Sequence, residues 1–353
     1  MRPWTSREAT SAHAVPESLA VVGGGVVGCE MAAAWQALGA HVTLIARESG
    51  LLERLPGFAG DFVASSLRDA GADVRLGANV TKAARDGGGP VTLTLDDGSV
   101  LTADEVLAAT GRAPRTADIG LETVGLEPGS WLQVDDTLRV VSGEGAARPI
   151  RSPAIGRASG SGGPGDVPRV GTAGGSSSRA STSDSPGAPW LYAVGDVNHL
   201  ALLTHMGKYQ ARICGDAIAA RAQGKEPAVR DRSSTTCVPQ VIFTVPEVAA
   251  VGLTEEQARD AGIRTRVVEF DIGNVAGASL FADGYTGKAQ MVTDEDRKVI
   301  VGMTLAGPGV GEIIHAATVA VAGKVPLDAL WHAVPSFPTI SELWLRLLES
   351  YGL

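Results

Sequence analysis

The fold of this chain is decided by the stretch Leu19-Ala20-Val21-Val22-Gly23-Gly24-Gly25-Val26-Val27-Gly28. Its first four residues form a short apolar run, and an Ala-rich helical pattern follows the glycines to about Leu38. We expect Gly39 to end this helix and residues 41–46 to form the next buried strand. The order of strand, glycine turn, helix and strand predicts a Rossmann-like unit that binds a dinucleotide.

Three glycines of this stretch have separate expected roles. Gly23 permits the tight turn out of the strand, Gly25 leaves room for the pyrophosphate, and Gly28 lets the helix pack close to the strand. The amide groups and the positive dipole end of the helix would then face the phosphates. The alternative interpretation is that the glycines only form a turn.

The cofactor preference depends on the residues that follow the second strand. Ala46 stands where an acidic residue would select NADH, and Arg47 and Arg54 come after it. Because a guanidinium donates two parallel hydrogen bonds to phosphate, these arginines favour NADPH with its 2′-phosphate. They can also be read as solvated surface residues. NADH stays open, because Glu48 could bind the ribose after a shift of one residue.

Further strands and helices are expected along the rest of the chain. The first part should hold a helix at 61–70, strands at 74–76, 91–95 and 105–109, and a hairpin turn at Asp97-Gly98. After it we expect a buried strand at 191–194, a helix at 204–223, strands at 238–243, 265–270, 288–293 and 299–306, and helices at 254–261 and 311–322.

Composition and charge argue against several classes of protein. The 353 residues carry a formal net charge of −9 without a basic stripe, so a nucleic-acid partner is not expected. No apolar run reaches the roughly 18–20 residues of a membrane span, and residues 1–16 lack a signal-peptide core. The expected location is therefore cytoplasmic, with no membrane partner. The three cysteines are too far apart for a metal knuckle or a CxxxxC redox pair, and no metal site is expected.

Five further motifs are spread along the chain. They are Ala109-Thr110-Gly111-Arg112-Ala113-Pro114, Leu191-Tyr192-Ala193-Val194-Gly195-Asp196, Leu203-Thr204-His205-Met206-Gly207-Lys208-Tyr209-Gln210, Phe243-Thr244-Val245-Pro246-Glu247-Val248-Ala249-Ala250-Val251-Gly252 and Phe337-Pro338-Thr339-Ile340-Ser341-Glu342. With the glycine stretch, they resemble the pyridine nucleotide-disulfide oxidoreductases, the family of glutathione reductase, dihydrolipoamide dehydrogenase and mercuric reductase.

The resemblance implies one edge of an FAD site. Gly195 and Asp196 match the second flavin-contacting motif, in which the carboxylate hydrogen-bonds the ribityl chain of FAD. His205 and Met206 would begin the helix that faces the flavin ring, although by spacing alone they are equally packing residues. In the family, the ADP half of FAD and the redox cysteine pair belong to a preceding segment, which we expect this chain to lack.

The resemblance also assigns residues around the dinucleotide. Gly111 and Arg112 match the motif where the chain leaves the nicotinamide domain, and Arg112 would lie near the cofactor. Glu30 matches the glutamate beside the nicotinamide carboxamide. A plain exit turn needs only the glycine and the proline of the first motif.

One catalytic position departs from the family pattern. In members that act on thiols, the last motif begins with His, which takes a proton from the dithiol, and its Glu orients that His. Phe337 replaces the His here and cannot accept a proton, so no catalytic residue is assigned at this position. Glu342 is then expected to be structural. His332 is a less favoured substitute, because the motif frame places Phe337 at the site.

The expected fold class is α/β, with a Rossmann-like NAD(P)-binding domain, a partial FAD-binding domain and a C-terminal α+β dimerisation domain. The expected boundaries are 1–16 for a connector, 17–112, 113–228 and 233–353. Residues 143–189 are rich in Gly, Ser and Pro and contain no aromatic residue, which predicts a disordered insertion or, alternatively, an interdomain linker.

Two functions remain possible on this basis. The first is an FAD-dependent NAD(P)H oxidoreductase that passes a hydride to flavin and on to a non-disulfide acceptor such as a quinone. It would be a homodimer through its C-terminal domain, and a partner chain could complete the FAD site. The alternative is a truncated, non-catalytic module that binds NADPH and dimerises without flavin.

Overall fold

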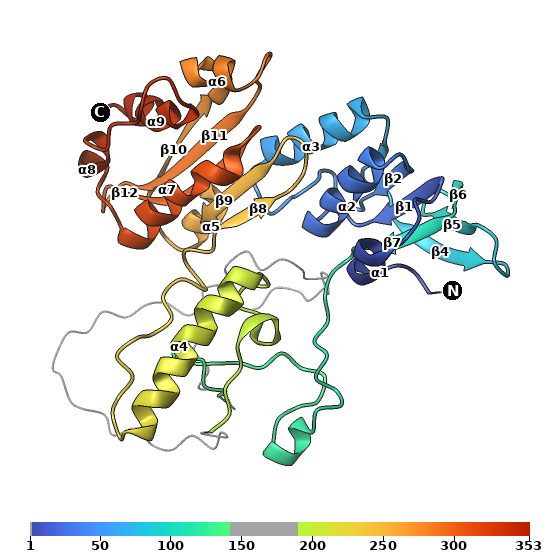
Figure 1. Cartoon of the computed structure of the whole chain (residues 1–353), viewed down its shortest axis with the longest axis horizontal. Helices are drawn as coiled ribbons and strands as arrows, with labels where there is room; N and C mark the ends of the chain where they lie inside the picture. The colour runs from blue at the N-terminus through green and yellow to red at the C-terminus, as the bar shows by residue number, and fades with distance from the viewer. Residues whose placement is uncertain (1, 142–189) are drawn as a thin grey trace.

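The computed structural model describes residues 2–141 and 190–353, which form three successive parts (Figure 1). The N-terminal part and the C-terminal part each contain sheets, and the long helix α4 (Thr204–Ala222) dominates the part between them. The insertion expected at 143–189 lies outside the described residues.

The N-terminal part is built on a parallel sheet in the order β3-β2-β1-β7. Its strands and helices are α1 (Ser6–Ser11), β1 (Ser18–Val22), α2 (Val26–Ala37), β2 (His41–Ile45), α3 (Gly57–Asp69), β3 (Asp73–Arg75) and β7 (Glu105–Ala108). Leu19, Val21, Leu44 and Leu107 are fully buried in this sheet, which explains the continuous apolar runs. The predicted order of strand, turn, helix and strand is confirmed.

Helix α3 begins four residues earlier than the predicted start at Asp61. Pro56 precedes its first turn with φ −53°, and a proline at a helix start supplies the backbone angle that the helix needs. The buried Ala59 lies in this added turn and continues the apolar face of Val63. The sequence signal was therefore present in the proline.

A three-stranded antiparallel sheet in the order β4-β5-β6 belongs to the same part. It contains β4 (Val80–Arg85), β5 (Val91–Leu95) and β6 (Val100–Ala103), and Gly98 forms the expected hairpin turn with φ +82°. We did not predict β4 and β6. Most of their residues are exposed or half-buried, so they show no clear apolar alternation.

The middle part contains η1 (Leu121–Val124), η2 (Gly195–Asn198) and α4. The prediction of a buried strand at 191–194 is wrong. Among the described residues, Tyr192 forms only an isolated bridge with Arg139, and Val194 is 37% exposed. An apolar run becomes a strand only where neighbouring strands supply backbone partners, and the run alone does not reveal them.

The C-terminal part is a five-stranded antiparallel sheet in the order β10-β11-β12-β9-β8, covered by helices. Its elements are β8 (Gln240–Ile242), β9 (Val248–Gly252), α5 (Glu255–Asp260), β10 (Thr265–Asp271), η3 (Ile272–Asn274), α6 (Ala276–Phe281), β11 (Lys288–Asp294), β12 (Val299–Ala306), α7 (Val310–Gly323), α8 (Leu327–Trp331), η4 (Ile340–Glu342) and α9 (Leu343–Tyr351). Met291, Met303, Leu305 and Leu347 lie in the core between the sheet and helices such as α7 and α9. The predicted α+β pattern is confirmed.

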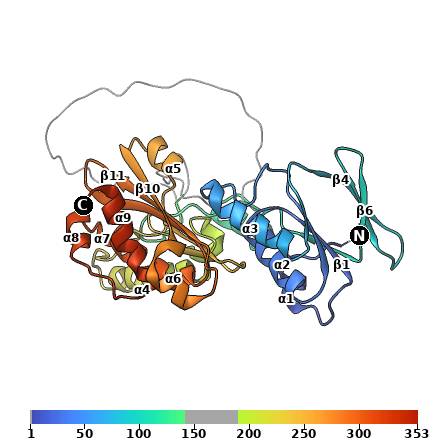
Figure 2. The same cartoon turned by 90° about the horizontal axis from the view of Figure 1, so that it is seen from above.

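The N-terminal and C-terminal parts pack against each other. Ile242, Val248 and Ala306 belong to the same buried cluster as Trp35 and Val63 of the dinucleotide unit. Figure 2 shows α3 on the side of the dinucleotide unit that faces the C-terminal part. Among residues 2–141 and 190–353, the helices are too short or too polar to cross a membrane.

Candidate dinucleotide and flavin sites

The glycine turn between β1 and α2 is closely packed. Gly23 has φ +121°, and a Cβ atom there would lie 2.5 Å from the carbonyl oxygen of Ala109. A Cβ on Gly28 would lie 1.8 Å from the carbonyl oxygen of Gly23. Only glycine fits at both positions, because any side chain would overlap the backbone.

Gly25 differs from its two neighbours in the motif. No described atom lies within 4 Å of a Cβ built on it, so the backbone is open to an approaching group. Gly25 is also the N-cap of α2, where no described side chain caps the helix and the first turn carries no acidic residue. These free amide groups beside open space fit the pyrophosphate of a dinucleotide.

Gly24 is a site residue that the motif analysis did not assign. A Cβ there would lie 2.8 Å from the Cβ of Ala46, and its carbonyl oxygen accepts a hydrogen bond of 2.9 Å from the Leu52 amide. The glycine turn is thus tied to the loop after β2. Three consecutive glycines, where the motif requires two, were the available signal.

The loop after β2 carries both charges that bear on cofactor choice. Arg47 Nε lies 2.7 Å from Glu48 Oε1, and their side chains are 50% and 33% exposed. The hydrogen bond to Glu48 raises the pKa of Arg47. Arg54 lies on the same loop and is exposed. Arg47, which favours NADPH, and Glu48, which would favour NADH, therefore form an ion pair with each other.

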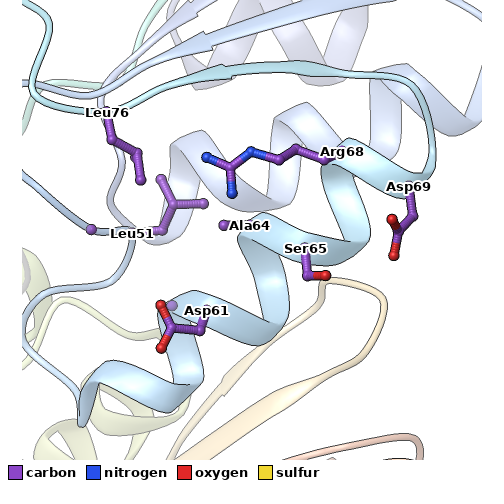
Figure 3. A pocket seen from close by; sticks show the side chains of 9 residues that line it. Leu51, Asp61, Ala64, Ser65, Arg68, Asp69 and Leu76 are labelled. Carbon is purple, nitrogen blue, oxygen red and sulfur yellow. The ribbon is translucent and has the colours of Figure 1, made fainter.

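A cavity of about 260 Å³ lies between this loop and α3. Residues from Gly50-Leu51 and from α3 line it, and Figure 3 shows the Arg68 side chain extending towards Leu51 and Leu76. Arg68 Nη2 lies 3.4 Å from the carbonyl oxygen of Val74. The residues that line this cavity include none of the predicted site residues.

Glu30 connects the dinucleotide unit with the C-terminal part. Its Oε1 accepts a hydrogen bond of 2.9 Å from the amide of Phe243, which begins the dimerisation-like motif. Burial raises the pKa of this carboxyl group. The residue expected beside the nicotinamide therefore also links two parts of the chain.

Arg112 and Asp196 bring two predicted cofactor motifs together. Arg112 Nη1 lies 2.8 Å from Asp196 Oδ2 and 3.4 Å from the carbonyl oxygen of Leu202. Gly111, with φ +143°, allows the chain to turn immediately before this arginine. Arg112 was predicted to lie near the dinucleotide, and the structure places its guanidinium on the flavin motif.

The turn that carries Asp196 is η2, and it rests on helix α4. Gly195 has φ +76°, and a Cβ on Gly207 of the helix would lie 3.3 Å from the Gly195 Cα atom. Two glycines thus face each other where the turn meets the helix. Asp196 itself remains accessible, because its side chain is 55% exposed.

Three buried polar residues behind this turn were missed by the sequence analysis. Gln210, Asn198 and Ser234 are at most 3% exposed, and Gln210 hydrogen-bonds both of the others. Polar residues inside an apolar pattern were the available signal, since buried polar groups need partners.

His205 and Met206 differ in accessibility. Met206 is 3% exposed, so it is a packing residue of the helix. His205 is exposed, and its Nε2 lies 2.8 Å from the carbonyl oxygen of Pro239. No described side chain caps the N-terminus of α4 at Leu203, and its first turn lacks acidic residues. This N-terminus therefore fits the partial negative charge of a flavin ring.

The C-terminal motif places an apolar side chain on the surface. Phe337 is 75% exposed, while Glu342 is 7% exposed. Glu342 Oε1 accepts a hydrogen bond of 2.6 Å from Arg346 Nη2. The carboxylate at the end of η4 is thus bound to a side chain of the following helix α9. Its buried Oε2 has no described hydrogen-bond partner, so the structural use expected of Glu342 stays a prediction.

All three cysteines are buried free thiols in the described structure. Burial raises the pKa of the Cys29 thiol to about 12, and it also raises the pKa values of Cys214 and Cys237. Since the thiolate is the nucleophile, none of them has the properties of a redox cysteine.

Comparison with known families and proteins agrees with this geometry. Residues 1–144 match a family model described as pyridine nucleotide-disulphide oxidoreductase, and residues 238–347 match the dimerisation domain of the same family. The dihydrolipoyl dehydrogenase of Haloferax volcanii is 28% identical in an alignment over 356 residues, which covers 98% of this chain and 63% of that protein. The mitochondrial dihydrolipoyl dehydrogenase of Homo sapiens is 28% identical and covers 99% of this chain, with 60% of its own length matched.

Solved structures show the same fold. The HOCl-induced flavoprotein disulfide reductase RclA from Escherichia coli, in its Cu(II) complex, superposes with a TM-score of 0.73 at 23% identity, over 98% of this chain and 66% of that one. LpdA from Mycobacterium tuberculosis gives a TM-score of 0.74 at 22% identity, over 99% of this chain and 64% of that one. The present chain thus spans about three fifths of the length of the curated relatives, which match 60–63% of their own residues. From the two family models and the dinucleotide geometry, we conclude that the chain belongs to the pyridine nucleotide-disulfide oxidoreductase family.

Proposed function

We propose that this chain provides the NAD(P)H site, one edge of the flavin site and the dimer interface of an FAD-dependent NAD(P)H oxidoreductase. The observation that carries the proposal is the glycine turn. Gly23 and Gly28 are held too tightly for any side chain, while Gly25 faces open space at an uncapped helix start. Tight packing at Gly23 and Gly28 beside open space at Gly25 is the arrangement that lets a pyrophosphate approach the backbone at Gly25.

The flavin edge consists of Asp196 and the start of α4. The half-exposed carboxylate is available to the ribityl hydroxyl groups, and the uncapped amide groups near Leu203 are available to the ring.

When bound, NAD(P)H and FAD supply two-electron chemistry, in which a hydride leaves the nicotinamide for the flavin and the electrons continue to an acceptor. The proposed acceptor is not a disulfide and is instead a compound such as a quinone. Support comes from the three buried cysteines and from the exposed Phe337, which provides an apolar surface without a proton acceptor.

We further propose that two copies associate through the C-terminal part. This part matches the dimerisation domain of the family. It also exposes large apolar side chains, among them Phe243, Val245, Val334 and Phe337, each at least 69% exposed. Exposed apolar side chains of this size are typical of surfaces that are covered by a partner.

For cofactor choice, NADPH is proposed over NADH. Arg47 and Arg54 supply two guanidinium groups on the loop after β2. Because Glu48 already binds Arg47, a 2′-phosphate has to displace this carboxylate. The preference is therefore expected to be modest.

The test combines two measurements on the purified protein. NADPH and NADH are titrated while tryptophan fluorescence is followed, and the visible flavin spectrum is recorded before and after addition of FAD. Saturable NADPH binding together with flavin absorbance that remains after gel filtration supports the proposal. A chain that binds neither cofactor would overturn it.

The alternative is an NADPH-binding dimerisation module without flavin. A specific observation favours it, because Asp196 is paired with Arg112 and the segment before it forms no sheet among the described residues. NADPH binding by a protein that stays colourless with added FAD would select this module. FAD-dependent oxidation of NADPH with a quinone would exclude it.

A further inference from the structure

Gln210 is fully buried on helix α4, although it carries a polar amide. Its Oε1 accepts two hydrogen bonds, from the Gly195 amide at 2.7 Å and from Asn198 Nδ2 at 2.8 Å. Its Nε2 donates to Ser234 Oγ at 3.0 Å. One side chain thus holds both the first and the last residue of the turn that contains Asp196.

The orientation of this amide follows from its partners. The Gly195 amide nitrogen can only donate, so the group that faces it has to be the oxygen of Gln210. The nitrogen of Gln210 then faces Ser234, whose own amide is held by Asp231 Oδ1 at 3.0 Å. Each polar atom of the glutamine side chain therefore has a partner.

The turn depends on these contacts because its backbone has an unusual form. Gly195 has φ +76°, and the backbone between it and Asn198 forms a short 3₁₀ turn outside any sheet. Asn198, at 3% exposure, connects the turn to its surroundings by donating to the Ala193 carbonyl at 3.1 Å and accepting from the Leu200 amide at 3.0 Å. Removal of the Gln210 oxygen would leave the part-buried Gly195 amide and one hydrogen of the buried Asn198 amide group without this acceptor.

We infer that Gln210 is a positioning residue of the flavin edge, which holds the turn Gly195–Asn198 so that the Asp196 carboxylate points outwards. Gln210 acts through the backbone of the turn and makes no contact with the ligand. The inference rests on the proposed function only where flavin is concerned, since the geometry of the turn is a property of the chain alone.

The first experiment measures amide hydrogen exchange of the chain without ligand. Gln210→Met removes both polar atoms, so exchange at Gly195, His199 and Leu200 is expected to rise about tenfold, while Ile213 on the same helix keeps its protection. Ser234→Ala is the matched control, because it removes only the contact on the far side of the amide. In Ser234→Ala, the amides of Gly195, His199 and Leu200 should stay protected from exchange.

Unchanged exchange of the turn in folded Gln210→Met would overturn the inference, and so would an equal loss of protection in Ser234→Ala. If Gln210→Met does not fold, Gln210→Glu decides, because its carboxylate still accepts from Gly195 and Asn198 while the Ser234 hydroxyl can rotate to donate. The amides of the turn are then expected to stay protected from exchange, and faster exchange in Gln210→Glu would count against the inference.

The second experiment is a double-mutant cycle on FAD affinity, followed by flavin fluorescence. Gln210→Met should weaken FAD binding about tenfold in the parent chain and have little effect in the Asp196→Ala background. Equal effects in both backgrounds would contradict action through Asp196. A parent chain that binds no FAD would count against the proposed function, and the exchange experiment would still decide the role of Gln210.

Discussion

Arg112 and Asp196, which are 84 positions apart in the sequence, form an ion pair with Nη1 2.8 Å from Oδ2. Their motifs point to two different cofactors when each is read alone. In the folded chain, the arginine that leaves the dinucleotide unit contacts the carboxylate of the flavin motif. The pair therefore connects the first and the middle parts of the protein.

Arg112→Leu should lower the free energy of unfolding by less than about 1 kcal/mol, because both side chains are roughly half exposed and water screens the pair. Urea unfolding at low and high salt checks this, and the difference between parent and variant should shrink at high salt. Asp196→Asn is the matched control from the other side of the pair. A loss above about 2 kcal/mol would show that Arg112 has a role beyond this contact.

Gly25→Ala and Gly28→Ala should separate ligand binding from folding. Gly25→Ala places its methyl group in open space, so we expect a change in stability within about 1 kcal/mol and at least about tenfold weaker NADPH binding. Gly28→Ala places a methyl group against the carbonyl of Gly23 and should destabilise the fold by about 1–3 kcal/mol. Thermal unfolding and NADPH titration of both variants test the assignment. It fails if Gly25→Ala binds NADPH like the parent.

Glu48→Gln should strengthen NADPH binding, because it frees Arg47 from its carboxylate partner. Arg47→Glu should weaken NADPH binding by repulsion of the 2′-phosphate and leave NADH binding nearly unchanged. The ratio of the two dissociation constants is the measurement. If neither substitution alters the ratio, the loop after β2 does not select the cofactor.

Glu30→Gln should change the pH dependence of stability. Burial raises the pKa of Glu30 in the folded chain above the ordinary value of 4.5, so the folded state binds this proton more tightly than the unfolded state. The contribution is present below pH 4.5 and is lost as the pH rises through the folded pKa. Glutamine keeps the acceptor for the Phe243 amide without ionising, so the variant should be the more stable protein at neutral pH.

The free energies of unfolding of the parent and of Glu30→Gln are compared by chemical denaturation, at steps of about one pH unit from pH 4 upwards. The two proteins should converge at the acidic end. A parent that gains stability relative to the variant as the pH rises would reverse the sign and contradict the assignment.

The cysteines should resist thiol reagents while the protein is folded. Burial raises the pKa of Cys29 to about 12 and also raises those of Cys214 and Cys237, so few thiolates are present at neutral pH. Aromatic disulfide reagents should modify all three only after urea is added. Rapid modification of the native protein would reopen a thiol-based acceptor reaction.

Much of the fold was readable from the sequence because local patterns carried it. The apolar run before Gly23, the Ala-rich helix and the stop at Gly39 produced β1 and α2 as predicted. Long strands with buried faces, such as β12 at Val299–Ala306, were also predictable from their apolar residues. The exposed strands β4 and β6 were not, because their residues face solvent and have no apolar period.

The sequence by itself determined which residues carry the cofactor motifs, since glycines and charged residues at fixed spacings are local features. Only the tertiary structure decided how these residues are used. It paired Arg112 with Asp196, joined Glu30 to Phe243 and placed Gln210 behind the flavin turn. Each of these contacts joins residues that belong to separate motifs or elements of the chain. The partner of a buried or charged group is set by the packing of the whole chain rather than by its neighbours in sequence.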